Sequence, residues 1–402
     1  MKKAGTTEVM IKITAANGQA SRAFTIVSAK DKLALTPTMG WNSWNVWGLD
    51  VDDAKVRAAA DNFMSTGLAA QGFQYINIDD GWEEGRDAKG NIKANKKFPD
   101  MKALSDYVHG KGLRLGIYSS PGPETCGGFM GSYKHEAQHA KTWASWGIDY
   151  LEHDWCSYGG IVKDNSLKEL QKPYKIMEKA LRATNRDIVY SLCQYGMGDV
   201  WNWGRDVGGQ LWRTTGDIVD TWSSLSEIGF SQAGKETKIG PGGWNDPDML
   251  IVGKVGWSAN IRNTRLTPNE QVLHVTLWSM LAAPLLLGND LTQLDDFTLD
   301  LLLNPEVIDI DQDPLGKPGV RKSTDGTIEV WTRRLHDGTT AVAVFNRGQL
   351  PAEATVRFAD LGLPAELSVR NVWLRKDLGK QKDRYSSRIP SHGALLLKLG
   401  TP

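Results

Sequence analysis

The alternation of short apolar runs with helical segments is the feature that most constrains the fold of this chain. From about residue 35, eight runs rich in β-branched and aromatic residues are separated by stretches whose apolar residues recur at helical spacing. The apolar runs cover residues 38–44, 73–82, 113–120, 148–156, 187–196, 211–218, a run that ends at 246, and 284–290. The helical stretches include residues 52–70, 100–111, 135–146, 166–184 and 268–281. Strands joined by covering helices form parallel βαβ units.

Eight such units predict an α/β fold, a (β/α)8 TIM barrel over residues 33–316, because eight strands with their helices close a barrel in ~250 residues. An open, doubly wound sheet is the alternative. That alternative is disfavoured because no Gly-x-Gly-x-x-Gly phosphate-binding loop follows the first strand.

The segments on either side of the barrel have a different pattern. After the Pro-Leu-Gly-Lys-Pro segment at 314–318 the helical spacing disappears, and alternating runs predict a small antiparallel β-sandwich over residues 317–402. These runs cover residues 327–333, 340–345, 354–358, 367–374 and 393–399. Residues 1–32 hold two alternating runs on either side of Asn17-Gly18, which predicts a β-hairpin. The hairpin resembles the last strands of an immunoglobulin-like domain, so we interpret it as a remnant of such a domain or as a linker.

Charge and composition exclude several classes of function. The chain has 47 basic and 47 acidic residues, so it has no net field to attract nucleic acid or an anionic membrane. No run approaches the roughly 18 apolar residues of a membrane span, and the first residues form no apolar signal core. The three cysteines lack metal-binding spacings, and neither an EF-hand loop nor an HExxH motif is present. We therefore expect no metal and no cofactor.

Carboxylates follow four of the eight predicted strands. Catalytic groups of TIM barrels lie at the C-terminal ends of the strands. These ends carry Asp79 and Asp80, Asp154, Asp217, and Asp246 with Asp248. One such aspartate is more commonly a helix cap or a turn former, but carboxylates on four strands together indicate a site. The site suits either a hard cation or acid/base chemistry on a sugar.

The aromatic content favours the sugar. The chain has 16 tryptophans, and many lie beside polar turn residues, where we expect partly open rings on which sugars stack. These are Trp41, Trp44, Trp82, Trp155 and Trp244. Glycoside hydrolysis requires one ionised carboxylate at the anomeric carbon and one protonated carboxyl at the leaving oxygen. The carboxylates at the strand ends can supply both.

Six motifs together resemble glycoside hydrolase family 27, the melibiase-like family of α-galactosidases and α-N-acetylgalactosaminidases. They are LTPTMGWNSW at 35–44, IDDGW at 78–82, LGIY at 115–118, WRTTGDI at 212–218, GPGGWNDPDML at 240–250 and DQDPLG at 311–316. The resemblance covers roughly residues 33 to 400, in order and at matching spacing. It implies a retaining, exo-acting glycosidase that removes terminal α-linked galactose from oligosaccharides or polysaccharides. It also implies a secreted or periplasmic parent protein whose signal is absent from this chain.

The resemblance implies roles for individual residues. Asp154 corresponds to the nucleophile and Asp217 to the general acid/base, so we expect their surroundings to push the two pKa values apart. The implied sugar pocket contains Trp44, Asp79, Asp80, Tyr118, Gln194, Arg213, Asp248 and Met249. Asp79 and Asp80 would accept hydrogen bonds from the 6- and 4-hydroxyls of galactose. Core packing is the alternative role for Trp44, Tyr118 and Met249.

The three cysteines have different expected roles. Cys126 and Cys156 match a pair that the family joins by a disulfide across the pocket rim, and two reduced thiols are the alternative. Cys193 lies in an apolar run, so we expect it to be buried and inert.

Glu152 departs from the family pattern, which typically has a lysine two residues before the nucleophile. Strand alternation places Glu152 with Asp154 on the inward face, as a further substrate-binding residue, and turns His153 outward to a packing role. An anion at Glu152 would raise the pKa of Asp154 and weaken the nucleophile.

This departure leaves two hypotheses. The first is a working α-galactosidase-like enzyme, with N-acetylgalactosamine or β-L-arabinopyranose as related substrates. The second is a catalytically impaired or engineered barrel that binds galactosides like a lectin. The presence of both Asp154 and Asp217 favours the enzyme. Asp79 leaves room for the galactose hydroxymethyl group, which argues against the arabinopyranose variant.

Overall fold

The computed structural model describes residues 5–28, 33–258 and 260–401. These residues belong to two compact units, residues 1–33 and residues 34–402. The described part of the first unit is a hairpin in which β1 (Gly5–Ala15) pairs antiparallel with β2 (Gly18–Ser28). The hairpin is confirmed, but Ala15 pairs with Gly18, so the turn is Ala16-Asn17 and lies one residue earlier than predicted. Its origin in an immunoglobulin-like domain stays a prediction.

The second unit contains the predicted barrel. Its eight parallel strands are β3 (Met39–Asn42), β4 (Tyr75–Asn77), β7 (Arg114–Ser119), β8 (Tyr150–His153), β9 (Val189–Leu192), β10 (Leu211–Arg213), β11 (Trp244–Asp246) and β14 (Leu285–Leu287). Their order in the sheet is β11-β10-β9-β8-β7-β4-β3-β14. A parallel bridge between Leu250 and Leu287 joins the two edges and closes the barrel. All eight predicted strands are confirmed, and each is shorter than its apolar run because the end of the run enters a loop.

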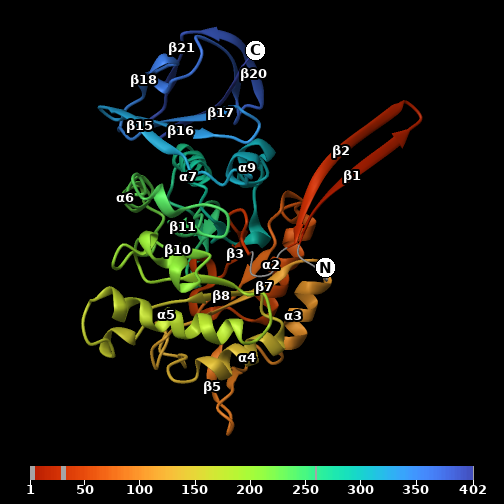
Figure 1. Cartoon of the computed structure of the whole chain (residues 1–402), viewed down its shortest axis with the longest axis vertical. Helices are drawn as coiled ribbons and strands as arrows, with labels where there is room; N and C mark the ends of the chain where they lie inside the picture. The colour runs from red at the N-terminus through yellow and green to blue at the C-terminus, as the bar shows by residue number, and fades with distance from the viewer. Residues whose placement is uncertain (1–4, 29–32, 259, 402) are drawn as a thin grey trace. The chain divides into compact units, whose positions relative to one another are not determined.

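Helices cover the outside of the barrel (Figure 1). The helices of this unit are α1 (Trp44–Trp47), α2 (Asp53–Ser65), α3 (Met101–Gly110), α4 (Glu136–Trp146), α5 (Leu167–Arg182), α6 (Trp222–Phe230), α7 (Pro268–Leu281), α8 (Asp296–Leu302) and α9 (Pro305–Asp311). The start of α7 is fixed by a capping box, in which the Thr267 hydroxyl accepts from the Glu270 N–H and the Glu270 carboxylate accepts from the Thr267 N–H. None of the helices in the described ranges is long and apolar enough to cross a membrane.

The C-terminal segment forms the predicted antiparallel domain. One sheet has the order β15-β16-β17-β22-β19-β20, and a second pairs β18 with β21. The strands are β15 (Val320–Asp325), β16 (Ile328–Arg334), β17 (Thr340–Asn346), β18 (Ala352–Arg357), β19 (Glu366–Asn371), β20 (Lys376–Lys382), β21 (Arg384–Ile389) and β22 (Ala394–Gly400). The buried Arg333 of β16 ties this domain to the barrel by donating to the carbonyl oxygens of Ser279 and Asp311. The predicted boundary after residue 316 lies between α9 and β15.

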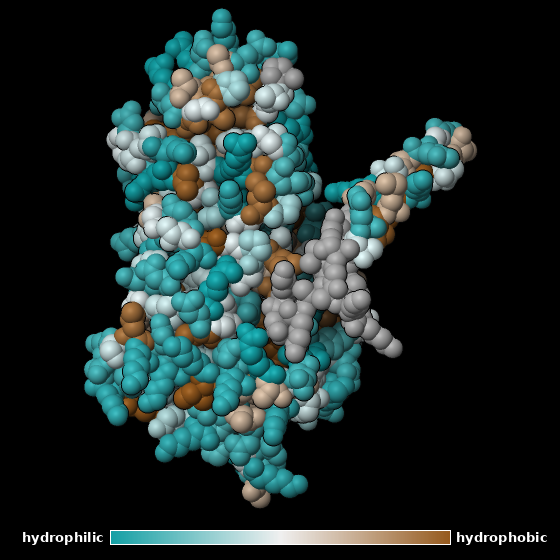
Figure 2. All heavy atoms as spheres, viewed as in Figure 1, coloured by the Kyte–Doolittle hydropathy of each residue, from teal (hydrophilic) through white to brown (hydrophobic). Residues whose placement is uncertain are grey.

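The apolar residues are concentrated inside these layers. The face of the molecule drawn in Figure 2 is mainly hydrophilic, with hydrophobic residues in small separate groups. One continuous buried core runs through the barrel strands and the inner faces of its helices and reaches Trp331, Phe345 and Leu396 in the C-terminal sheet. The barrel therefore has a packed interior that holds the strand ends, and the loops after them, in fixed positions.

Candidate active site

The polar side chains at the C-terminal ends of the strands surround one pocket. Its lining consists of Trp44, Asp79, Asp80, Tyr118, Cys126, Glu152, Asp154, Cys193, Tyr195, Arg213, Asp217, Asp248 and Met249. Every residue predicted for the sugar pocket lines it except Gln194. The pocket wall brings together residues from seven of the eight strands or from the segments that follow them.

Asp154 lies directly after β8, and three donors hold its carboxylate. The Tyr195 hydroxyl donates to Oδ1 at 2.5 Å, the Trp155 backbone N–H donates to the same oxygen at 2.6 Å, and the Tyr118 hydroxyl donates to Oδ2 at 2.7 Å. Burial raises the pKa of Asp154 above its ordinary value, while these three hydrogen bonds lower it. A nucleophile is expected to have a lowered pKa. Burial therefore acts against this role of Asp154, and the three hydrogen bonds act in its favour.

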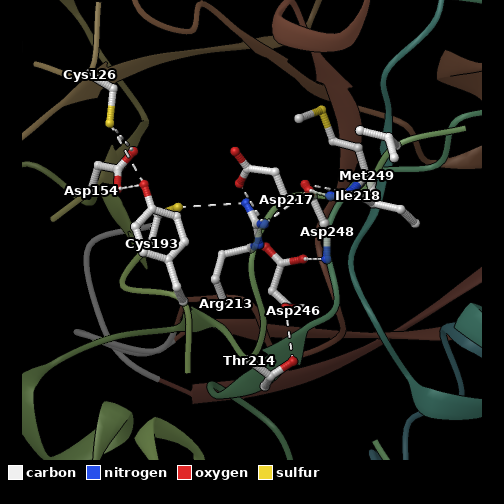
Figure 3. A network of polar contacts seen from close by, with 12 residues as sticks. Cys126, Asp154, Cys193, Arg213, Thr214, Asp217, Ile218, Asp246, Asp248 and Met249 are labelled. Atoms are coloured by element: carbon white, nitrogen blue, oxygen red, sulfur yellow. Dashed lines mark hydrogen bonds and ion pairs between the residues drawn. The ribbon is translucent and has the colours of Figure 1, made fainter. Parts of the chain in front are cut away.

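Asp217 has a different environment at the mouth of the same pocket. Its side chain is 60% exposed, whereas Asp154 is 5% exposed. The buried Arg213, at the end of β10, donates to Asp217 at 2.9 Å and forms an ion pair with Asp248 at 3.0 Å. Figure 3 shows the Arg213 guanidinium between these two carboxylates. One carboxyl group is thus held in the pocket by hydroxyl donors, and the other is open to solvent.

Asp79 and Asp80 follow β4 and face the pocket as hydrogen-bond acceptors. Asp79 Oδ1 accepts from the Asp80 N–H at 2.8 Å, and Asp80 Oδ2 accepts from the Gly127 N–H at 2.6 Å. Burial raises the pKa of Asp79 to about 7. Gly127 has no room for a side chain, because a Cβ atom there would lie 3.0 Å from the Asp80 carboxylate and 2.8 Å from Leu49. The close approach of this loop to Asp80 requires glycine.

The predicted disulfide is confirmed. Cys126 and Cys156 are bonded, with their Cα atoms 5.1 Å apart, and they join the loop after β7 to the loop after β8. Gly127 follows Cys126 directly, so the disulfide also anchors the N–H group that donates a hydrogen bond to Asp80. Cys193 is buried, as predicted, and lies in the pocket wall with its sulfur 3.6 Å from an Arg213 nitrogen.

Reduction of this disulfide is expected to weaken substrate binding more than turnover. A freed loop no longer holds the Gly127 N–H against Asp80, and one hydrogen bond to a charged group is worth about tenfold in affinity. KM should therefore rise by about tenfold with a smaller change in kcat, measured before and after treatment with a thiol reductant. A Cys126→Ser/Cys156→Ser variant is the control, because the reductant should not change its KM further. An unchanged KM in the reduced enzyme would show that the disulfide does not position Asp80.

Gln194 is the predicted pocket residue that the structure places elsewhere. It is buried, and neither atom of its side-chain amide has a hydrogen-bond partner among the described residues. The next residue, Tyr195, has a left-handed backbone with φ of +62° and reaches the pocket with its hydroxyl on Asp154. Sequence reasoning missed Tyr195. Its position before Gly196, in the turn at the end of a barrel strand, is the signal that could have indicated it.

Replacing Tyr195 by phenylalanine is expected to move the acid limb of the kcat/KM profile to higher pH. The Tyr195 hydroxyl lowers the pKa of Asp154, so its loss raises that pKa and protonates the carboxylate at higher pH. A shift of about one pH unit corresponds to the usual worth of a hydrogen bond to a charged group. Tyr174→Phe is a matched control, because the Tyr174 hydroxyl donates to the backbone oxygen of Asp154 at 3.1 Å. An equal shift in both variants would contradict the prediction.

Glu152 and His153 point to opposite sides of β8, as strand alternation predicts. Glu152 lines the pocket and accepts from the Asn42 side-chain amide at 3.0 Å. His153 is fully buried between the rings of Tyr174 and Tyr190, at centroid distances of 5.9 and 6.0 Å. Burial lowers the pKa of His153 to about 3, so it is a neutral packing residue. The packing role predicted for His153 agrees with this arrangement.

The five tryptophans expected to be partly open fall into two groups. Trp44 and Trp155 are partly exposed, and Trp44 lines the pocket. The expectation is wrong for Trp41, Trp82 and Trp244, which are at most 1% exposed. Their indole N–H groups donate to the backbone oxygens of Asn289, Tyr118 and Ala34 respectively. Each satisfies its polar edge inside the protein, so the whole ring can be buried.

A pocket at the mouth of a TIM barrel that combines a hydrogen-bonded carboxylate, an exposed carboxyl group and further acceptors for hydroxyls defines a carbohydrate-hydrolysing enzyme. Comparison with known proteins identifies the family. Residues 36–313 match the family model described as Alpha galactosidase A, and residues 325–399 match the Alpha galactosidase C-terminal beta sandwich domain. The chain belongs to the α-galactosidase family, glycoside hydrolase family 27, and is a glycosidase.

Relatives of known name match the chain over most of its length. The alpha-galactosidase of Cyamopsis tetragonoloba is 43% identical over 377 residues, which cover 92% of this chain and 88% of the relative. Alpha-galactosidase A of Homo sapiens is 36% identical and covers 91% of this chain and 89% of its own length. The crystal structure of alpha-galactosidase I from Mortierella vinacea superposes with a TM-score of 0.87 at 35% identity, covering 93% of this chain and 99% of that one.

Proposed function

We propose that this chain is an exo-acting α-galactosidase that releases terminal α-linked galactose from oligosaccharides or polysaccharides. The observation that carries the proposal is the pair Asp154 and Asp217, one held in the pocket by three donors and one exposed at its mouth. The named relatives are alpha-galactosidases, and the structure of the Saccharomyces cerevisiae enzyme with raffinose superposes with a TM-score of 0.82 at 25% identity. Galactosides are therefore the proposed substrates.

The proposed mechanism is a double displacement with retention of configuration. A carboxylate oxygen of Asp154 attacks the anomeric carbon while Asp217 donates its proton to the leaving oxygen, so one carbon–oxygen bond forms as the glycosidic bond breaks. In the second step Asp217 takes a proton from water, which attacks the same carbon and releases Asp154. Arg213 orients Asp217 through Nη2, and the same nitrogen also pairs with Asp248.

The position of Asp217 also indicates where the leaving group lies. Asp217 lines both the sugar pocket and a second, shallower hollow on the outer side. This hollow is lined by Thr215, Gly216, Asp217, Val219, Thr221, Ser223, Ser224, Glu227 and Ile228. A residue that protonates the leaving oxygen must stand between the two halves of the substrate. The many hydroxyl groups of the hollow suit a second sugar as the leaving group.

One argument favours galactose as the sugar in the pocket, and a second favours a working enzyme. Asp79 and Asp80 present carboxylate acceptors to the hydroxyls of the substrate, and a site built to accept these hydrogen bonds discriminates strongly against a sugar that lacks them. The intact set of donors on Asp154 argues against a lectin-like barrel that has lost catalysis. A β-L-arabinopyranosidase of this family from Geobacillus stearothermophilus also superposes, at 27% identity with a TM-score of 0.82, so arabinopyranose is a necessary comparison.

A panel of p-nitrophenyl glycosides tests this proposal. We expect the highest kcat/KM on the α-galactoside, with the α-N-acetylgalactosaminide and the β-L-arabinopyranoside as comparison substrates. Preference for either comparison substrate would overturn the galactose assignment. Binding of galactose in a calorimeter without turnover of any glycoside would instead favour the lectin-like barrel.

We further infer that the protein works outside the cytoplasm, in the periplasm or after secretion. The Cys126–Cys156 disulfide supports this location, because structural disulfides persist in oxidising compartments.

A further inference from the structure

The sugar pocket has an excess of carboxyl groups over cations. Six carboxyl groups line it: Asp79, Asp80, Glu152, Asp154, Asp217 and Asp248. Arg213 is the one basic side chain in the described lining, and its guanidinium already pairs with Asp217 and Asp248. The remaining four carboxyl groups have no cation of their own. Several anions cannot share such a buried space, so a proton must reside on at least one of them.

Hydrogen-bond donors show which carboxyl groups the protein stabilises as anions. Asp154 accepts from three donors, and Asp79 and Asp80 each accept from a backbone N–H. Glu152 accepts only from the amide of Asn42, which also serves Asp79. Glu152 therefore has the weakest support for a negative charge of these four groups.

The groups that face Glu152 from the neighbouring strands also disfavour its anion. Asp79 from β4, Asp154 at the end of its own strand and Asp246 from β11 are carboxyl groups, and Arg213 from β10 is the opposing cation. The phenol of Tyr150, two residues earlier in β8, is uncharged. Burial, and next the charge of Asp79, raise the pKa of Glu152 well above its ordinary value. Burial, and to a smaller extent the charges of Asp80 and Asp154, raise the pKa of Asp79 to about 7, but the backbone N–H of Asp80 favours the anion there.

Acceptors outnumber donors among the polar side chains that line the pocket. Every sugar hydroxyl both donates and accepts, but Asp79, Asp80 and Asp154 only accept when they are ionised. The hydroxyls of Tyr118 and Tyr195 are already committed to Asp154. A substrate bound there needs a donor for its oxygen lone pairs, and a protonated Glu152 would be that donor.

We propose that Glu152 is a neutral carboxylic acid in the working enzyme and donates its O–H to a hydroxyl oxygen of the bound sugar, so that it determines substrate specificity. The proposal rests on the proposed galactosidase function. Glu152 is a binding residue with no part in bond cleavage. The O–H of Glu152 supplies a hydrogen-bond donor to the sugar without adding a charge beside the nucleophile Asp154.

The decisive comparison is between two substitutions of similar size. Glu152→Gln is neutral, keeps an N–H donor and retains an oxygen for Asn42, so galactose affinity should stay within about threefold of wild type. Glu152→Met has no donor and should lose about tenfold in galactose affinity, the usual worth of one hydrogen bond. Galactose affinity is measured by calorimetry, separately from turnover. A tenfold or larger loss of affinity in a folded Glu152→Gln enzyme would overturn the proposal.

Infrared spectroscopy tests the proton itself. The spectrum of wild type minus that of Glu152→Gln at neutral pH should contain the carbonyl band of a protonated carboxylic acid, and a carboxylate band in its place would overturn the proposal. Glu227→Gln, at an exposed carboxyl group outside the sugar pocket, is the control and should give no such band.

If the Glu152→Gln variant does not fold, a third measurement uses the wild-type protein instead. Addition of galactose to wild type should then shift the protonated-acid band, and an unshifted band would contradict donation to the sugar. Absence of turnover on all galactosides would refute the proposed function, and the band would still report whether Glu152 holds a proton.

Discussion

Asp154→Ala should lower kcat on α-galactosides by on the order of 10⁴-fold or more, because the variant has no oxygen to form the covalent intermediate. Azide should restore part of the rate. The small anion can enter the space left by the carboxylate, between the hydroxyls of Tyr118 and Tyr195 that held it. Because azide then attacks from the side of the missing nucleophile, the product should be β-galactosyl azide, with inverted configuration.

The configuration of the azide product distinguishes this role from others and is read by proton NMR. Asp164→Ala, at an exposed aspartate outside the pocket lining, is the control and should keep wild-type activity. Circular dichroism establishes that both variants are folded. Formation of α-galactosyl azide by Asp154→Ala, or retention of more than about a hundredth of the wild-type rate, would contradict the assignment of Asp154 as nucleophile.

The sequence predicted the elements whose pattern is local. The strands of the barrel are short and strongly apolar, so their composition alone marks them, and all eight are present. The three sandwich strands β15 (VRKSTD), β20 (KDLGKQK) and β21 (RYSSRI) were missed because they are largely exposed and have few apolar residues to alternate. The helix α6 was missed because it has nine residues and follows a loop without a clear apolar spacing.

The side chains that sequence reasoning misplaced depend on contacts far along the chain. Trp41 is buried because its indole N–H reaches the backbone oxygen of Asn289, 248 residues later. Tyr195 enters the pocket because its backbone is left-handed, a conformation that no periodic pattern indicates. The protonation of Glu152 depends on carboxyl groups from β4 and β11, whose proximity follows only from the closed barrel. The sequence motifs located the residues of the site, and the fold determines their partners.

Asp217→Ala should lower activity by a factor that depends on the leaving group. Asp154→Ala, by contrast, should lower the activity on all galactosides alike. When galactose is linked to another sugar, that sugar is a poor leaving group and needs a proton. The kcat/KM on such galactosides should therefore fall by on the order of 10³-fold or more. An activated galactoside, such as the dinitrophenyl derivative, leaves without a proton and should react in its first step at nearly the wild-type rate. Asp164→Ala is the control, because Asp164 is an exposed carboxyl group outside both hollows, and it should keep the wild-type kcat/KM on both kinds of galactoside.

Azide gives this variant a product of the opposite configuration to that of Asp154→Ala. In Asp217→Ala the galactosyl ester on Asp154 still forms, and azide replaces water in the second step, because it needs no general base. Attack on the ester returns the original configuration, so the product should be α-galactosyl azide. An equal loss on activated and unactivated galactosides would instead mean that Asp217 acts through Arg213, by holding the guanidinium that also binds Asp248.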